Sequence, residues 1–493
     1  MTYTVTAPIT DVLDQIMASI PLFKPELLLI GGFIATIVSA LFVGKRLRNF
    51  TFAVYLLTIL ITIYFLQAQL PTVATGFSGM WMIDPLSTYA RIIIATGGGI
   101  IGLFIQQRHK LGNNGDVYSI LLAAILGMNV LCNSSNWILA FIGIETVSIA
   151  SYVLVGYFSQ NKAQAEAAMK YALFGSVCAA VMLYGLSLIY GLTGSLDFQS
   201  PEQLQGLMVA PEPILTIALL FVFVGIGFKL SFVPFHVWSP DVYEGAPTAI
   251  TAFLSTIPKI GALILFTRLY TAWSSTAFYF SDLTTSFILF VSITSMLVGN
   301  LAALRQKNIK RLMAYSSIGH TGFLLMAVFA YQANYPYLLF YIMAYVLMNL
   351  ATFIFIDALE ERTGSTALSA YAGLGRKMPI LFTSLTVLAV SLVGLPPTIG
   401  FIGKLLVFTA VFDTYQMADE GAVLFLLIVG ALTAVISLFY YFRIPFYAFL
   451  KNNESPDIVS SDSKILVWLG YVLTACVILL GLFPSILLNL ITS

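Results

Sequence analysis

The sequence consists of long apolar stretches, almost free of charged residues, that are separated by short polar connections. A helix needs about 20 apolar residues to cross a bilayer, and by this measure the chain divides into about fourteen segments. They cover residues 26–44, 51–70, 86–105, 117–133, 137–158, 168–192, 213–238, 248–272, 280–304, 312–332, 335–357, 379–412, 421–446 and 464–490. We expect helices rather than a barrel, because barrel strands would read as short segments of alternating hydrophobicity. The pattern therefore predicts an all-α polytopic membrane protein.

Two of these segments, the seventh and the twelfth, contain helix-breaking residues close to a lysine. The seventh reads FVGIGFKLSFVPFHVW around Lys229, and the twelfth reads VGLPPTIGFIGKLLVF and includes Lys404. Glycine and proline free backbone groups inside a membrane only where protein or a wet cavity can satisfy them. We therefore expect broken helices 7 and 12. Paired interrupted helices of this kind are typical of transporters with inverted repeats.

The spacing of ionisable residues also suggests a repeat. Lys404 follows Lys229 by 175 residues, and His320 follows Glu145 by the same interval. Coincidence is the alternative explanation, since few ionisable residues lie in the segments. The interpretation divides the chain into a three-helix segment (1–116), two inverted five-helix repeats (117–272 and 280–446) and a C-terminal helix (447–493), because an odd number of helices per repeat reverses the second copy.

Composition agrees with a membrane protein, since 59% of the residues are hydrophobic and only 9% are charged. A soluble protein of this length carries roughly a quarter charged residues. Basic residues gather in alternate connections: Lys45, Arg46, Arg48, Arg108, Lys110, Lys162, Arg305, Lys307, Lys310, Arg311, Arg362, Arg376, Lys377, Arg443, Lys451 and Lys464. By the positive-inside rule, both termini face the outside, which is the periplasm in a bacterium. The first 23 residues have no basic region of the kind that begins a secretory signal.

Charged residues deep in a membrane segment are costly and mark a functional site by default. The candidates are Glu145, Lys170, Lys229, Lys259, His320 and Lys404. A buried ammonium releases its proton readily when it is alone and keeps it beside a carboxylate, so moving one neighbour switches its charge. We expect Glu145 to be the partner of Lys229. The alternatives for Lys229 and Lys404 are a static salt bridge or snorkelling, although both residues lie too centrally to reach the membrane surface.

Three further positions have more open interpretations. Lys170 is near the start of its segment, where snorkelling or pairing with Glu166 one turn earlier competes with a relay role. His320 has a side chain that can pass protons near neutral pH, but a buried hydrogen-bonded histidine is the alternative. For Asp241 and Glu244, in the connection after the seventh segment, we favour turn formation and capping over the collection of protons.

Several classes of chemistry have no support in the sequence. No phosphate-binding loop or dinucleotide fingerprint is present, and Gly97–Gly99 lie inside an apolar segment, where they favour close helix packing. Cys132, Cys178 and Cys476 are far apart and form no CxxC or iron–sulfur spacing. We therefore expect no cofactor or metal in this chain, and no nucleic-acid partner.

Three stretches resemble a known family. They are PFHVWSPDVYEGAPTAITAFLSTIPKIG, GLPPTIGFIGK and EAAMKYALFGS. They are similar to the antiporter-like membrane subunits of respiratory complex I, the proton-translocating NADH–quinone oxidoreductase, and within that family to the N type, or subunit 2. The family is related to the membrane subunits of Mrp-type cation/proton antiporters, and the resemblance covers residues from about Val117 to Phe446.

The resemblance implies a proton path with named residues. It places Glu145 and Lys229 in the input half, Lys259 at the centre, Lys404 in the output half and His320 in the second repeat. It also implies M-type and K-type neighbours in a bacterial cell membrane, with NADH, FMN, iron–sulfur clusters and quinone bound by partner subunits. The alternatives are an Mrp-type sodium/proton antiporter subunit and a membrane scaffold whose charges no longer function.

Overall fold

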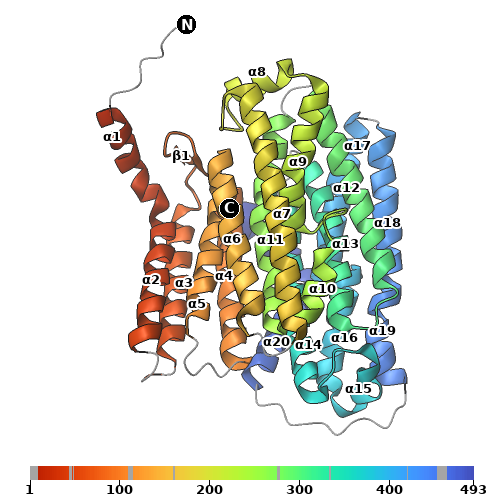
Figure 1. The fold of residues 1–493 in the computed structure, drawn as a ribbon. Coiled ribbons are helices and arrows are strands. Elements are labelled where there is room, and N and C mark those ends of the chain that lie inside the picture. Colours follow the sequence, from red (N-terminus) through yellow and green to blue (C-terminus); the bar gives the residue numbers. More distant parts are fainter. Residues whose placement is uncertain are drawn as a thin grey trace.

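The structure is a computed structural model. It describes residues 9–43, 47, 49–108, 115–158, 162–274, 278–331, 335–418, 420–451 and 464–492. Lys45, Arg46, Arg48 and Lys110, which contribute to the predicted orientation, lie outside these ranges. The long helices run side by side along one common direction (Figure 1).

Each predicted segment contains a helix. The long helices are α2 (Lys24–Phe42), α3 (Phe50–Gln69), α4 (Pro85–Arg108), α5 (Val117–Asn133), α6 (Trp137–Tyr157), α7 (Lys162–Thr193), α9 (Glu212–Leu230), α11 (Thr248–Trp273), α12 (Tyr279–Ala303), α13 (Ile309–Phe329), α14 (Tyr335–Thr363), α16 (Pro379–Val393), α17 (Ile399–Ala418), α18 (Gly421–Tyr441) and α20 (Lys464–Leu482). Among the described residues, 12 helices are long and apolar enough to cross a membrane, and α5 and α16 are shorter apolar helices. The predicted all-α polytopic architecture is confirmed.

Several short elements were not predicted from the sequence. They are α1 (Ile9–Ser19), η1 (Ile20–Phe23), α8 (Pro201–Val209), α10 (Trp238–Gly245), η2 (Leu368–Tyr371), α15 (Leu374–Lys377), α19 (Arg443–Pro445), η3 (Phe446–Leu450) and α21 (Pro484–Thr492). A small antiparallel hairpin joins β1 (Ala74–Gly76) to β2 (Trp81–Ile83). These elements are too short for the hydrophobic ruler that finds membrane spans.

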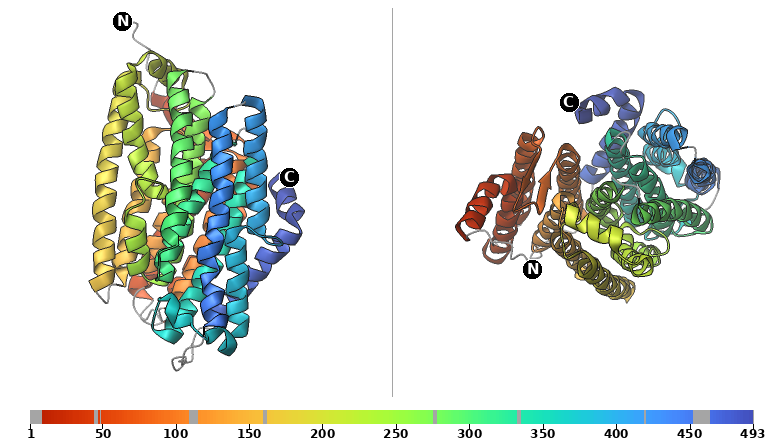
Figure 2. Two further views of the ribbon diagram at one scale, coloured as in Figure 1. Left: turned by 90° about the vertical axis from the view of Figure 1, so that its right-hand side faces the viewer. Right: turned by 90° about the horizontal axis from the view of Figure 1, so that it is seen from above.

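The two ends of the bundle differ in character. The hairpin and α8 lie at one end, which we call the hairpin end, and α15 lies at the opposite end, which we call the basic end (Figure 1). The connection between α12 and α13, with Arg305, Lys307, Lys310 and Arg311, is also at the basic end. Seen from above, α2 and α3 lie to one side and the later helices group beside them (Figure 2).

Both predicted helix interruptions are present. The helix α9 ends at Leu230, Ser231 takes a left-handed conformation with φ of 59°, and α10 begins seven residues later. The helix α16 ends before Gly394, whose φ is 88°, and α17 begins at Ile399. Left-handed backbone is accessible to glycine at little cost. Each break therefore leaves helix ends inside the bundle.

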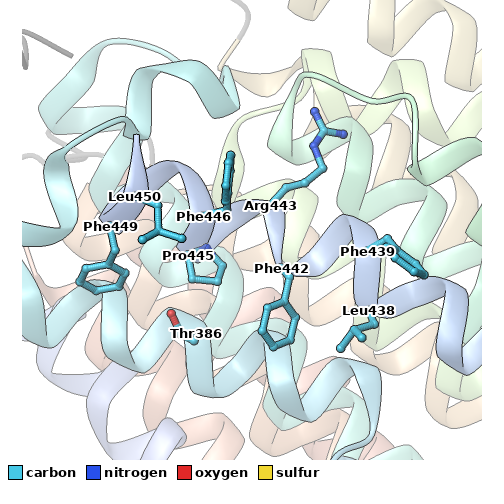
Figure 3. A pocket seen from close by; sticks show the side chains of 9 residues that line it. All are labelled: Thr386, Leu438, Phe439, Phe442, Arg443, Pro445, Phe446, Phe449 and Leu450. Carbon is cyan, nitrogen blue, oxygen red and sulfur yellow. The ribbon is translucent and has the colours of Figure 1, made fainter. Parts of the chain in front are cut away.

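Three helices form the centre of the molecule. The apolar windows of α11, α13 and α14 are 100%, 94% and 89% buried, whereas that of α7 is only 28% buried. The outer helices therefore face lipid, and groups on α11, α13 and α14 are shielded from it. An apolar groove of about 610 Å³ on the outer surface lies where α18 meets α19 and η3, and Figure 3 shows that Arg443 points away from it.

Close contact between α12 and α13 depends on Gly299. A Cβ atom at this position would lie 2.4 Å from the backbone nitrogen of Gly319 and 2.8 Å from the carbonyl oxygen of Tyr315. We predict that Gly299→Ala lowers the free energy of unfolding by about 1–3 kcal/mol, the usual cost of overpacking. Gly191→Ala is the matched control, because no atom lies within 4 Å of its Cβ position. Equal thermal unfolding midpoints for the two variants would refute this account of the packing.

Candidate functional site

Four of the predicted residues lie in the interior of the bundle. The exposed fractions are 3% for Lys229, 2% for Lys259, 5% for Lys404 and 4% for His320. Glu145 on α6 is half-buried. Since long basic side chains are almost never fully buried without a purpose or a partner, the contacts of each lysine decide what the site can do.

Lys229 ends the first half of the seventh segment, in the last turn of α9. Its ammonium donates a hydrogen bond of 3.0 Å to Oγ of Ser148 on α6. The expected direct pair with Glu145 is not formed, and Glu145 Oε1 has no hydrogen-bond partner among the described residues. Ser148 follows Glu145 by three residues on α6, so it lies on nearly the same helix face. Glu145 still acts on Lys229 through its charge, but a hydroxyl rather than a carboxylate receives the proton donor.

Lys259 lies in the middle of α11 and is held by hydroxyl groups of α13. Its Nζ donates to Oγ of Ser317 at 2.7 Å and to Oγ1 of Thr321 at 3.0 Å. The Thr321 hydroxyl in turn donates to the carbonyl oxygen of Leu230 at 3.0 Å. Leu230 is the residue after Lys229, so Thr321 connects the central lysine to the broken end of α9.

Lys404 lies on α17, just after the second break. Its ammonium donates to the carbonyl oxygens of Leu392 at 3.1 Å and Val393 at 2.8 Å, in the last turn of α16. It also lies 4.6 Å from the centroid of the Phe323 ring. The C-terminal end of a helix carries partial negative charge, which favours a cation there. A Cβ atom on Gly394 would lie 2.8 Å from Cδ of Lys404, so the glycine leaves room for this side chain.

His320 on α13 lies between two tyrosines. Its Nδ1 is 2.8 Å from the hydroxyl of Tyr341, and its Nε2 is 3.5 Å from that of Tyr441. Tyr441 also forms a hydrogen bond with Ser316. These bonds fit a histidine held in place by its neighbours, the alternative considered from the sequence, and they equally give it groups with which a proton could be exchanged.

Lys170 differs from the other lysines, because its side chain is 36% exposed. It pairs with Glu166 at 2.7 Å, as the alternative interpretation expected, and also with Asp241 at 2.9 Å. Arg311 binds the same Asp241 at 2.6 Å and Glu244 at 3.1 Å. The two acids therefore join α10 to α7 and α13 through ion pairs, which is more than the turn formation and capping expected from the sequence.

Sequence reasoning missed other buried charges. Glu26 and Arg91, both fully buried, form an ion pair of 2.9 Å between α2 and α4. Near the basic end, Asp357 on α14 lies 3.3 Å from Arg108, and Lys310 lies 3.9 Å from Glu360. Arg91 sits inside a predicted segment and could have been found. The others lie near segment ends, where exposure was the simpler expectation.

The interval of 175 residues does not match the helices. The start of α13 follows that of α6 by 172 residues, and Lys229 precedes its helix break whereas Lys404 follows its own. The local register makes Ser317 the counterpart of Glu145 and Ser148 the counterpart of His320. The equal spacing of the two pairs is therefore not an equivalence of positions.

Buried lysines at helix breaks, in a bundle of this size, define a membrane protein that moves ions or protons. The family model described as NADH:quinone oxidoreductase/Mrp antiporter, TM, matches residues 134–437. The chain is 36% identical over 458 residues to NADH-quinone oxidoreductase subunit N 2 of Chloroherpeton thalassium, covering 90% of this chain and 88% of that protein. It is 37% identical to NAD(P)H-quinone oxidoreductase subunit 2 of Prochlorococcus marinus, covering 79% and 73%.

Solved structures agree. A chain of respiratory complex I from Thermus thermophilus with bound aureothin matches with a TM-score of 0.78 and 28% identity, covering 94% of this chain and 98% of that one. A chain of the Mrp complex from Dietzia shares the fold, with a TM-score of 0.79 at 19% identity over 95% of both chains. The chain belongs to the family of subunit N of NADH-quinone oxidoreductase, the antiporter-like membrane subunits of complex I.

The ion pairs of Asp241 make a prediction about acid stability. Burial alone would raise the pKa of this carboxyl, but hydrogen bonds from Lys170 and Arg311 outweigh it and lower the pKa below its ordinary 3.8. A lowered pKa gives stability that is present above the ordinary value and is lost as pH falls through the lowered one. We therefore expect the unfolding temperature of the native chain to fall more steeply below about pH 4 than that of Asp241→Asn.

Two further variants control this measurement. Lys170→Met and Arg311→Met each remove one partner of Asp241, so each should flatten the acid limb of the stability profile in part. If Asp241→Asn showed the same dependence on pH as the native chain, the ion pairs would have no role in stability.

Proposed function

We propose that this chain moves protons through the membrane arm of complex I by way of Glu145, Lys229, Lys259, His320 and Lys404. The observation that carries the proposal is that three buried lysines are held by hydroxyls and carbonyls, with no carboxylate within ion-pair distance among the described residues. An ammonium held only by neutral groups in an apolar interior is easily deprotonated. Such a lysine can be charged and discharged by small changes around it.

The input half is built on Lys229 and Glu145. When Glu145 approaches Lys229, the ammonium form is favoured; when they separate, the proton is free to leave toward the centre. Ser148 and Thr321 provide hydroxyls that accept one proton and give up another. Thr321 already binds both Lys259 and the carbonyl of Leu230, so it is the direct connection between the input half and the central lysine.

The output half is built on Lys404 and His320. Lys404 is neutralised in part by the carbonyl end of α16. His320, with Tyr341 and Tyr441, lies on the central helix α13 and interacts with both Lys259 and Lys404 through its charge. A proton on any one of these three groups therefore disfavours a proton on the other two. Lys170 is proposed only as an outer member of the path, because it is partly exposed and already paired.

We infer that α5–α11 and α12–α18 are two inverted five-helix repeats. In support, α6 and α13 both begin with an asparagine cap, Asn136 and Asn308, and each cap forms an isolated bridge to a residue after the following long helix. In each set the fourth helix is the broken one. Successive long helices reverse direction, so sets of five run oppositely.

The wider assembly is part of the same proposal. We propose M-type and K-type subunits as neighbours, with NADH, FMN, iron–sulfur clusters and quinone bound in partner subunits. We place the chain in a bacterial inner membrane with the basic end toward the cytoplasm, because basic residues of connecting loops favour that side. An Mrp-type sodium/proton antiporter is the second candidate, favoured by the shared fold. Co-purification with NADH-oxidising subunits distinguishes the two.

Replacing a relay lysine by methionine tests the proposal. Methionine fills a similar volume but carries no proton. We expect Lys229→Met, Lys259→Met and Lys404→Met each to lower the rate of proton uptake by membrane vesicles by about tenfold or more, since positioned proton-transfer groups commonly contribute at least that much. The measurement is proton pumping per assembled complex, driven by NADH and quinone.

Lys377→Met is the control for these variants. Lys377 is exposed at the basic end, so the same change in charge should leave pumping unaltered. Native rates in all three relay variants would show that the buried lysines do not carry protons.

A further inference from the structure

A row of polar residues runs along α11 from the basic end to Lys259. Thr248, Thr251, Ser255 and Lys259 follow one another at intervals of three or four residues, so they share one face of the helix. All four are buried. This face packs against α10, α13 and α14. We call the polar contact region of these four helices the inner seam.

The outer end of the inner seam contains a carboxylate that reaches water. The side chain of Glu360 is 32% exposed and lies 3.9 Å from the buried Lys310. Its other oxygen accepts a hydrogen bond of 2.5 Å from Thr248, the first residue of α11. Lys310 donates to the carbonyl oxygen of Ala246 at 2.8 Å. An exposed acid and a buried base are therefore joined at the point where α11 begins.

The inner end of the seam is the hydrogen-bonded cluster around Lys259. Ser317, which accepts from Lys259 at 2.7 Å, also lies 2.7 Å from the hydroxyl of Tyr345. The Tyr345 hydroxyl donates to the carbonyl oxygen of Ser255 at 2.7 Å. Lys310 and Ser317 are seven residues apart on α13, which corresponds to about 10 Å along the helix.

Tyr243 on α10 occupies the space between these two ends. Its side chain is fully buried, and its hydroxyl is close enough to Ser317 and Tyr345 to interact with both. That hydroxyl has no hydrogen-bond partner of normal geometry among the described residues. Thr251 donates to the backbone carbonyl of Tyr243 at 3.1 Å and so holds α10 against α11.

A second unpartnered atom lies in the same region. Asn349 is fully buried one turn beyond Tyr345 on α14, toward the basic end, and its Oδ1 has no partner among the described residues. Its amide nitrogen is already used, since it donates to the carbonyl oxygen of Tyr345 at 2.8 Å. Buried donors and acceptors of this kind are normally paired with ordered water. Two such atoms between Glu360 and Lys259 indicate a hydrated path.

We propose that the inner seam is a proton inlet from the basic end directly to Lys259, with Glu360 and Lys310 as its collecting pair and Tyr243 as its link. A proton taken from water by Glu360 passes through ordered water to the oxygen of Tyr243, which releases its own proton to Ser317. Ser317 passes its proton to the neutral amine of Lys259, so that each hydroxyl ends as it began. This inference rests on the proposed relay function of Lys259.

The inlet is distinct from the approach to Lys229. Between the Lys170 ion pairs and Lys229 lies a stack of aromatic rings, in which Tyr171 and Trp238 are 4.3 Å apart and Trp238 and Phe228 are 5.0 Å apart. Phe228 immediately precedes Lys229. The stack places apolar ring faces where the seam places hydroxyls, so the seam is the better-hydrated route from this end.

Tyr243→Phe tests the link, because it removes one hydroxyl and keeps the ring. We expect proton pumping per assembled complex to fall severalfold, and Glu360→Gln to have a similar effect. Tyr55→Phe is the matched control. Tyr55 is also fully buried and hydrogen-bonded, to the carbonyl oxygen of Gly98 at 2.6 Å, but lies outside the seam. Its variant should pump at the native rate.

The outcomes separate the inlet from the relay. If Lys259→Met stops pumping while Tyr243→Phe and Glu360→Gln pump normally, the inlet is wrong and the relay stands. If Lys259→Met itself pumps normally, the relay is wrong. Where a seam variant assembles poorly, the native complex provides the second measurement. A high-resolution density map should show ordered water beside Tyr243 and Asn349, and a dry seam would overturn the proposal.

Discussion

The structure depends on the cost of placing a lysine ammonium inside a bundle that has no water of its own. An isolated charge is expensive there, and the protein lowers the expense with neutral dipoles instead of opposite charges. Hydroxyls surround Lys259, a single serine binds Lys229, and the carbonyl end of a half-helix receives Lys404. The two helix breaks follow from this need, because an unbroken helix has no free carbonyls at the membrane centre. Dipoles solvate an ammonium without fixing its protonation state, whereas carboxylates would hold it charged.

The same constraint explains where full ion pairs occur. Carboxylate and base meet at the basic end, as in Asp241 with Arg311, or in the N-terminal helices, as in Glu26 with Arg91. Such pairs hold helices in register but resist changes in protonation. The molecule thus separates static charge pairs from the lysines held by dipoles. The central helices α11, α13 and α14 carry the second kind, protected from lipid by the surrounding helices.

Much of the fold could be predicted from the sequence, because bilayer thickness sets the length of each apolar segment. Both helix breaks followed from the glycine and proline residues near Lys229 and Lys404. The contacts were harder to predict. Glu145 and Lys229 attract each other in principle, yet Ser148 receives the lysine, because side-chain direction on α6 depends on how α6 packs against α9. Spacing in the sequence also suggested that Glu145 and His320 were equivalent, whereas loops of unequal length shift the register of the helices. Tyr243 and Thr321 carry no charge, so nothing in a single sequence distinguishes them from other buried polar residues.

The central claim is that these lysines change protonation during turnover. Solid-state nuclear magnetic resonance of ¹⁵N-lysine in the membrane-embedded complex tests it most directly, because the Nζ signal separates ammonium from neutral amine. The signals of Lys229, Lys259 and Lys404 can each be assigned by their loss in the corresponding methionine variant. The account predicts that at least one of the three is neutral at rest, and that its population shifts when NADH and quinone are supplied. Three ammonium signals that stay unchanged between rest and turnover would contradict it.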